Sequence, residues 1–257
     1  MRKPVVFFTI ADQNNLKYAK ALENSFRKFH KDIDFIIVQG EDLQAYLKDD
    51  PQFFYRATPI LAEKFLKEYE LVVKIDSDSI VLGDLSYIWK TPDYDVATVI
   101  NWNRYDAQRY PIVQFQGVLP IEYMNCGLVC MRNEKFVHDW KILCFTEQYN
   151  RSQYKEQDML NAMIYYGNWN VRCLDHGDGP ANMYAWWGLL GKLEWSRAEL
   201  RGNDVVVPKG LGDTPFPPKD VELKVVHMAG GSPKESWGKF FNEKIMKRIN
   251  FLTSEEK

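Results

Sequence analysis

The sequence predicts an α/β fold in which a central, mostly parallel sheet is flanked by helices. Short runs of β-branched residues alternate along the first half of the chain with segments whose apolar residues recur at helical spacing, and this alternation is typical of a parallel sheet. The 257 residues are 46% hydrophobic and 14% aromatic, which is enough to bury a core without disulfide bonds. Because no repeat, Gly/Ser linker or low-complexity tract divides the chain, we expect a single domain over residues 1–257.

Each predicted element in the first half rests on the period of its apolar residues. Short runs of β-branched or aromatic residues are too brief for helices and are predicted as strands. Longer segments with apolar residues every three or four positions are predicted as helices. The strands are expected at Val5–Ile10, Phe35–Val38 and Leu71–Ile75, and the helices at Asn14–His30, Leu43–Leu47 and Arg56–Tyr69.

The second half is less regular. We predict strands at Asp95–Ile100 and Val225–His227 and a helix at Lys155–Tyr166. In the segment YMNCGLVCMRN, Asn125 and Gly127 are expected ahead of a strand, where small residues let a ligand approach the backbone, although a bulge explains them nearly as well. An amphipathic helix is predicted at about residues 234–252, and we expect it to pack on the protein rather than on a membrane surface.

Charge and cysteine content exclude several classes of partner. A net charge of −2 gives no basic face for nucleic acid. The four cysteines lack the CxxC pairs of zinc sites and are predicted to be reduced core residues of a cytoplasmic protein. The apolar run near the amino terminus is too short for a signal peptide or a membrane span.

Two aspartates mark the end of the strand Leu71–Ile75. Asp76 and Asp78 follow its carboxyl end, which is the edge where open α/β sheets bind ligands. Two carboxylates this close repel each other unless a cation or a proton lies between them, and hard oxygen ligands suit Mg²⁺, Mn²⁺ or Ca²⁺. The alternative is an ordinary strand-to-turn junction, because Asp and Ser are common turn residues.

Other candidate residues stand near predicted element ends. Glu156 and Asp158 fall in the first turn of a helix, where carboxylates are stabilised by the helix dipole without any chemistry, whereas Gln157 has no such explanation. His227 ends a strand and could bind a metal ion, although taken alone it is more often a satisfied core histidine.

Taken together, these motifs resemble the GT-A-fold (Rossmann-like nucleotide-diphospho-sugar transferase) glycosyltransferases, most closely the retaining enzymes of glycosyltransferase family 8. The resemblance runs from Val5 to about Trp237 and rests on five stretches in order. They are TIADQNNLKY at 9–18, Asp76-Ser77-Asp78, Asn125-Cys126-Gly127, Glu156-Gln157-Asp158 and the H-x-x-G-x-x-K pattern from His227 to Lys234.

The resemblance implies a nucleotide-sugar donor, a UDP-sugar, and an acceptor that the sequence does not identify. By resemblance, Mn²⁺ or Mg²⁺ is held by Asp76, Asp78 and His227, and the catalytic group comprises Gln157, Glu156, Asp158 and Asn125. The residues that the resemblance assigns to donor binding are Thr9, Ala11, Asp12, Tyr18, Arg56, Ser77, Gly127, Gly230 and Lys234. Glu156 stands where the family has aspartate, and this longer acid leaves the identity of the sugar open.

The implied reaction moves a hexose from the donor to the acceptor with retention at the anomeric carbon. No strong carboxylate nucleophile is evident, and an amide is a poor one, so front-face attack is favoured. Two alternatives remain. A haloacid-dehalogenase-type phosphatase shares the DxDx string but has it on a first strand, and a catalytically inactive sugar-nucleotide-binding protein would not need the intact metal ligands.

Overall fold

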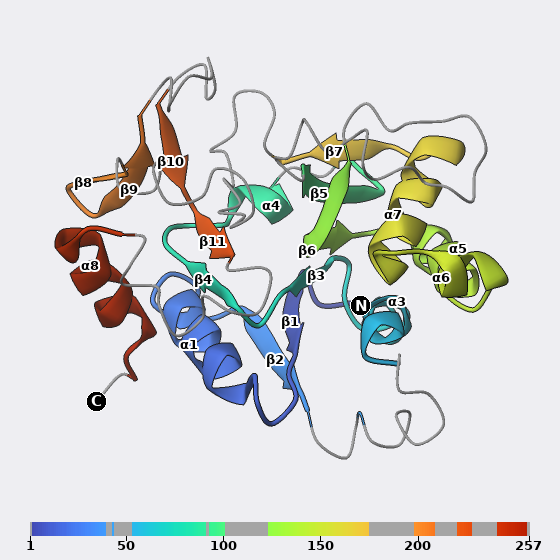
Figure 1. Cartoon of the computed structure of the whole chain (residues 1–257), viewed down its shortest axis with the longest axis horizontal. Coiled ribbons are helices and arrows are strands. Elements are labelled where there is room, and N and C mark those ends of the chain that lie inside the picture. The colour runs from blue at the N-terminus through green and yellow to red at the C-terminus, as the bar shows by residue number, and fades with distance from the viewer. Residues whose placement is uncertain are drawn as a thin grey trace. The chain divides into compact units, whose positions relative to one another are not determined.

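The computed structural model describes residues 2–39, 43, 53–90, 93–100, 123–174, 198–208, 220–227 and 241–255. The chain divides into two compact units, and Figure 1 shows their elements. The first unit comprises Met1–Asn14, Ile33–Asp76 and Ile88–Cys173, and the second comprises Asn15–Asp32, Ser77–Tyr87 and Leu174–Lys257. Because the two units alternate along the sequence, no single cut in the chain separates them.

The first unit is built on a six-stranded sheet in the order β2-β1-β3-β6-β5-β7. β1 is parallel to β2 and β3, and β5 is parallel to β7, whereas β6 runs antiparallel to both of its neighbours. The strands are β1 (Val6–Ile10), β2 (Asp34–Val38), β3 (Val72–Ile75), β5 (Val96–Ile100), β6 (Met124–Met131) and β7 (Val171–Cys173). This mostly parallel sheet confirms the predicted fold class.

One face of this sheet carries the main core of the first unit. Val6 and Phe8 on β1 belong to one buried cluster with Phe136 and Trp140. Phe7, between them, points to the opposite face and makes an edge contact with Trp89, as strand alternation requires. The helices of this unit are α3 (Phe53–Phe65), α5 (Glu134–Leu143), α6 (Glu147–Arg151) and α7 (Lys155–Tyr166), and α4 (Tyr87–Lys90) begins at its boundary.

The second unit contains α1, two small sheets and the carboxyl-terminal helix. β4 pairs antiparallel with β11, and the Ser25 hydroxyl of α1 accepts a hydrogen bond of 3.0 Å from the Val81 N–H at the end of β4. The other sheet has the order β10-β9-β8, with Gly202 at a φ of 64° in the turn between β8 and β9. The elements are α1 (Leu16–Arg27), β4 (Ser79–Val81), β8 (Glu199–Arg201), β9 (Asp204–Val207), β10 (Val221–Leu223), β11 (Val225–His227) and α8 (Glu243–Thr253).

Two sequence predictions need correction. Asn125 and Gly127 lie inside β6 and not ahead of it, because the strand continues through a bulge. The carboxyl-terminal helix begins at Glu243 and not near residue 234, because the Asn242 side chain accepts a 3.1 Å hydrogen bond from the Ile245 N–H and caps it there. Most of the helix predicted at Leu43–Leu47 lies outside the described residues.

The structure places three of the four cysteines in the core, where the sequence predicted all four. Cys126, Cys130 and Cys144 are buried, and Cys173 is half-buried. Across the described residues, none of the helices has the length and apolar character needed to cross a bilayer.

Candidate metal and donor site

The two aspartates lie where the chain leaves the main sheet. β3 ends at Ile75 and β4 begins at Ser79, so Asp76, Ser77 and Asp78 form the whole connection. The Asp76 N–H donates to the Gly127 carbonyl at 2.8 Å, which extends the pairing of β3 with β6 by one residue. Since β1 and β3 are parallel, the carboxyl end of β1 lies at the same edge as Asp76.

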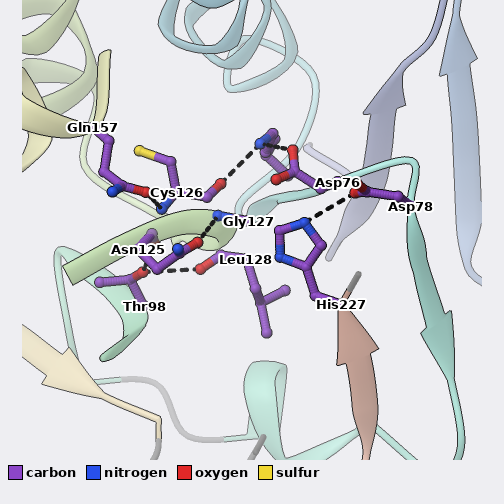
Figure 2. A network of polar contacts seen from close by, with 10 residues as sticks. Asp76, Asp78, Thr98, Asn125, Cys126, Gly127, Leu128, Gln157 and His227 are labelled. Atoms are coloured by element: carbon purple, nitrogen blue, oxygen red, sulfur yellow. Dashed lines mark hydrogen bonds and ion pairs between the residues drawn. The ribbon is translucent and has the colours of Figure 1, made fainter. Parts of the chain in front are cut away.

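Strand pairing in the second unit brings His227 to Asp78. β11 is in register with β4 such that His227 lies opposite Ser79, the residue after Asp78. The His227 Nε2 atom is 2.9 Å from the Asp78 Oδ1 atom, and both side chains are buried (Figure 2). A three-residue strand near the end of the sequence therefore delivers a histidine to the aspartate motif, as the prediction required.

Asp76 joins this pair through the short connection that it shares with Asp78. One ligand atom from each of Asp76, Asp78 and His227 lies within 4.8 Å of the other two. Two carboxylates and an imidazole are a donor set that suits Mn²⁺ well and Mg²⁺ acceptably, so the residues present fit the implied ion. The three predicted ligands are brought together.

Lys74 is a further charged residue here that the sequence predictions missed. It is buried within β3, and its Nζ atom donates to the Asp76 carboxylate and, at 2.8 Å, to the Cys126 carbonyl. Burial is the largest single influence and opposes its charged form, but the interactions with Asp76, Cys126 and Glu156 together outweigh burial and raise the pKa of Lys74 above its ordinary value. The signal was available, because a lysine inside an otherwise apolar strand needs a buried partner.

The bulge in β6 shapes the backbone next to Lys74. Thr98 and Val99 are consecutive on β5, but their partners on β6 are Val129 and Asn125. The intervening stretch is held in place by side chains: the Asn125 Oδ1 atom accepts from the Gly127 N–H at 2.5 Å, and the Thr98 hydroxyl lies 2.5 Å from the Asn125 carbonyl (Figure 2). Asn125 thus stabilises the bulge through its own side chain.

The first turn of α7 faces the same bulge. The Gln157 Oε1 atom accepts a 2.9 Å hydrogen bond from the Cys126 N–H (Figure 2). A backbone N–H can pair only with an acceptor, so this contact assigns the orientation of the Gln157 amide. Both backbone polar groups of Cys126 are therefore hydrogen-bonded to side chains, the carbonyl to Lys74 and the N–H to Gln157.

The two acids beside Gln157 have different environments. Asp158 is buried and accepts hydrogen bonds from the Tyr123 hydroxyl at 2.5 Å and from the Tyr154 N–H at 2.9 Å, so it secures the start of α7. The Glu156 Oε2 atom is buried and has no hydrogen-bond partner among the described residues. Burial, with smaller contributions from Asp76 and Asp158, raises the pKa of Glu156 to about 8.

The predicted donor-binding residues are distributed over both units. Thr9 and Ala11 are buried at the end of β1, and the Thr9 hydroxyl has no partner within the described chain. Asp12 is exposed in the loop that follows, and Tyr18 lies on α1 in the second unit. Ser77 is buried between the two aspartates. Gly230 and Lys234 fall outside the residues that the structure describes.

Arg56, also predicted to bind the donor, is engaged with the segment around α6. Its Nε atom donates to the Cys144 carbonyl at 2.8 Å, and one terminal nitrogen is 3.1 Å from the Asn150 side-chain oxygen. Its guanidinium group also stacks on the Tyr149 ring, 4.4 Å from the ring centre. These contacts give Arg56 a structural task, and its role in donor binding stays a prediction.

Comparison with protein-family models and with curated protein sequences gives no match to this chain. Solved structures do match it. The galactosyltransferase LgtC, in complex with donor and acceptor sugar analogues, is 15% identical with a TM-score of 0.61, and the match covers 98% of each chain. Another LgtC structure carries an active-site mutation of glutamine to glutamate.

Two further glycosyltransferases are longer than this chain. The bifunctional WbbM is 17% identical with a TM-score of 0.62, and the match covers 99% of this chain and 50% of WbbM. GlyE of Streptococcus pneumoniae is 13% identical with a TM-score of 0.54, and the match covers 100% of this chain and 61% of GlyE. At such low identity these likenesses establish architecture alone, and this chain has the GT-A glycosyltransferase fold that the sequence predicted.

Proposed function

We propose that this protein is a metal-dependent glycosyltransferase that moves a hexose from a UDP-sugar to an acceptor not yet identified, with retention of the anomeric configuration. The observation that carries the proposal is the group formed by Asp76, Asp78 and His227. It lies at the carboxyl end of β3 in a GT-A fold, where open α/β sheets bind their ligands.

Departure of UDP is the step that these residues support. The C1–O bond of the donor breaks with its electron pair passing to the diphosphate, so negative charge grows on the leaving oxygen while the sugar gains positive charge. A divalent ion held by Asp76, Asp78 and His227 would supply charge neutralisation for that leaving group. By the sequence resemblance, Lys234 would add a further positive charge on the diphosphate.

The surroundings of α7 favour front-face attack over a covalent intermediate. The side-chain Oε1 atom of Gln157 already accepts a hydrogen bond from the Cys126 N–H, so it is a poor candidate for attack on C1. Glu156, with a pKa of about 8, is largely protonated at pH 7, and a neutral carboxyl group is a poor nucleophile. In front-face transfer the acceptor oxygen bonds to C1 on the side that UDP leaves, and its proton passes to the departing phosphate oxygen.

The phosphatase alternative has weaker support. The nucleophilic aspartate of that class belongs to a first strand, whereas Asp76 follows β3, the third strand along the chain. The placement of all three predicted metal ligands within reach of one ion counts against a catalytically inactive protein.

The test is donor hydrolysis in the presence of Mn²⁺. The purified protein is incubated with a panel of UDP-sugars and UDP release is measured, because transferases hydrolyse their donors slowly when no acceptor is present. Asp78→Asn should abolish release, whereas Asp139→Asn, which removes a half-buried carboxylate of α5 that pairs with Lys135, should leave it unchanged. Phosphate release from simple phosphomonoesters, with no UDP released from any donor, would support the phosphatase and overturn the proposal.

A further inference from the structure

Lys74 places a fixed positive charge beside the candidate metal site. Only 7% of its side chain is exposed, and its ammonium group contacts the Asp76 carboxylate directly. The Cys126 carbonyl accepts a second hydrogen bond from it at 2.8 Å. An ion bound to Asp76 would therefore share that carboxylate with a buried ammonium group.

We propose that Lys74 is a built-in counter-cation of the metal site, which orients Asp76, opposes the binding of free divalent ion, and so makes ion and nucleotide diphosphate bind together. This inference rests on the proposed function, because it concerns the same donor site. Lys74 acts through Asp76 and is a positioning residue, because this role needs no contact with the sugar or the reacting atoms.

A count of charges shows why the lysine should couple the two ligands. Asp76 and Asp78 each bring a negative charge and Lys74 brings a positive one, so these three side chains together carry one net negative charge when no ion is bound. That charge attracts a divalent ion only moderately. Once the ion is bound, the site carries one net positive charge, which attracts the negatively charged diphosphate.

Loss of the lysine charge should change the two affinities in opposite directions. Without it, the empty site has two net negative charges and holds free ion more tightly, while the ion-loaded site is neutral and holds the diphosphate less tightly. A lysine that only fills space or braces the backbone predicts something else: both affinities would fall together, or neither would change.

The experiment is calorimetry on the full chain, with Mn²⁺ titrated alone and UDP titrated at saturating Mn²⁺. Lys74→Met removes the charge at similar volume, and Lys74→Gln removes it while keeping a donor for the Cys126 carbonyl. For both variants we expect Mn²⁺ alone to bind about tenfold more tightly or better, and UDP about tenfold more weakly, since one charge beside a divalent ion has an effect of that size even at water-like dielectric.

Lys141→Met is the matched control. Lys141 forms an ion pair with Glu63 between α5 and α3, so its removal changes the net charge equally without touching Asp76. Both of its affinities should equal those of the wild type. Parallel losses in the two Lys74 variants, or unchanged affinities, would overturn the counter-cation role. If the wild-type protein fails to bind UDP with Mn²⁺, the proposed function fails instead, and the titration of Mn²⁺ alone still decides the role of Lys74.

A measurement on the wild type covers the case in which neither variant folds. Protein labelled with ¹⁵N-lysine is titrated with diamagnetic Mg²⁺, and the side-chain signal of Lys74 is followed by NMR. A shift that saturates with ion binding supports direct competition for Asp76. A signal that stays in place while the ion binds would overturn it.

Discussion

The carboxyl group of Glu156 should make stability fall as pH rises. Its pKa is raised from an ordinary value of 4.5 to about 8, chiefly by burial. Between these values the folded protein holds a proton that the unfolded chain has released. The stabilising contribution of this group is therefore complete below about pH 4.5 and is lost as pH rises to about 8. The free energy of unfolding falls by at most about 1.4 kcal/mol per pH unit over this range. Glu156→Gln should abolish this component of the slope.

Urea unfolding in EDTA at pH 5, 6.5 and 8 measures the effect of Glu156. The variant should gain stability relative to the wild type as pH increases, because an amide has no proton to lose. Glu134→Gln is the matched control: Glu134 also lies in the first turn of a helix, but it is exposed. Parallel profiles for wild type and Glu156→Gln would show that Glu156 titrates normally.

Gln157 combines a structural contact with its predicted place beside the reacting carbon. Gln157→Ala should lower sugar transfer far more than UDP binding, and it should also cost about 1–3 kcal/mol because the Cys126 N–H loses its acceptor. Gln157→Glu retains an acceptor oxygen, so it should lose less stability while transfer still falls. Transfer rates, UDP affinity and urea midpoints separate these effects, and equal losses of transfer and binding would recast Gln157 as purely structural.

At the scale of elements, Asn161 joins α7 to β6. Its side chain is fully buried, its Oδ1 atom accepts from the Met124 N–H at 2.7 Å, and its Nδ2 atom donates to the Met124 carbonyl at 2.8 Å. The same nitrogen also donates to the Gln157 carbonyl at 2.8 Å. The side-chain amide of Asn161 thus pairs with the first residue of β6 and holds the turn of α7 that carries Gln157.

Asn161→Ala should destabilise the protein by about 2–4 kcal/mol, because it leaves buried backbone groups of Met124 without partners. Denaturant unfolding measures this loss. The control is Asn203→Ala, in the exposed turn between β8 and β9, which should change stability by less than about 0.5 kcal/mol. A small effect at Asn161 would mean that packing of α7, and not this amide, secures the junction.

Element ends were harder to predict from sequence than element types. α7 and β11 have the predicted bounds, because periodicity and flanking residues agreed there. The start of α8 was predicted too early, because the apolar residues before Asn242 also recur at helical spacing. Asn242 itself is a typical cap residue. The bulge in β6 depends on which residues of β5 lie opposite, and one strand's sequence holds no such information.

For the whole molecule, the alternation of strands and helices was sufficient to predict the mostly parallel sheet, and the motif order was sufficient to predict that Asp76, Asp78 and His227 lie close together. The second contact of Lys74 could not be predicted, because its acceptor, the Cys126 carbonyl, is distant in sequence but adjacent in the sheet. The hairpin of β8 and β9 was also missed. Its strands are short, and two of the three residues of β8 are exposed, which leaves little apolar pattern to detect.

Filling the donor site should stabilise the whole chain against unfolding. A ligand that binds only the folded state stabilises it by about 2.7 kcal/mol at a hundred times its dissociation constant. For a chain of this length we therefore expect Mn²⁺ with UDP to raise the unfolding temperature by about 5–10 °C, and EDTA to cancel the rise. UDP alone should have little effect, because Asp76 and Asp78 repel the diphosphate.

His227→Gln tests whether the last strand completes that site. His227 is a buried residue of β11 that reaches Asp78, so the substitution removes a ligand from the ion while the amide can still hydrogen-bond to the carboxylate. The rise in unfolding temperature with Mn²⁺ and UDP should shrink to a small fraction of the wild-type value, whereas the unfolding temperature in EDTA should change much less. A full rise in the variant would place His227 outside the ion's coordination shell, and metal binding would then depend on the two aspartates.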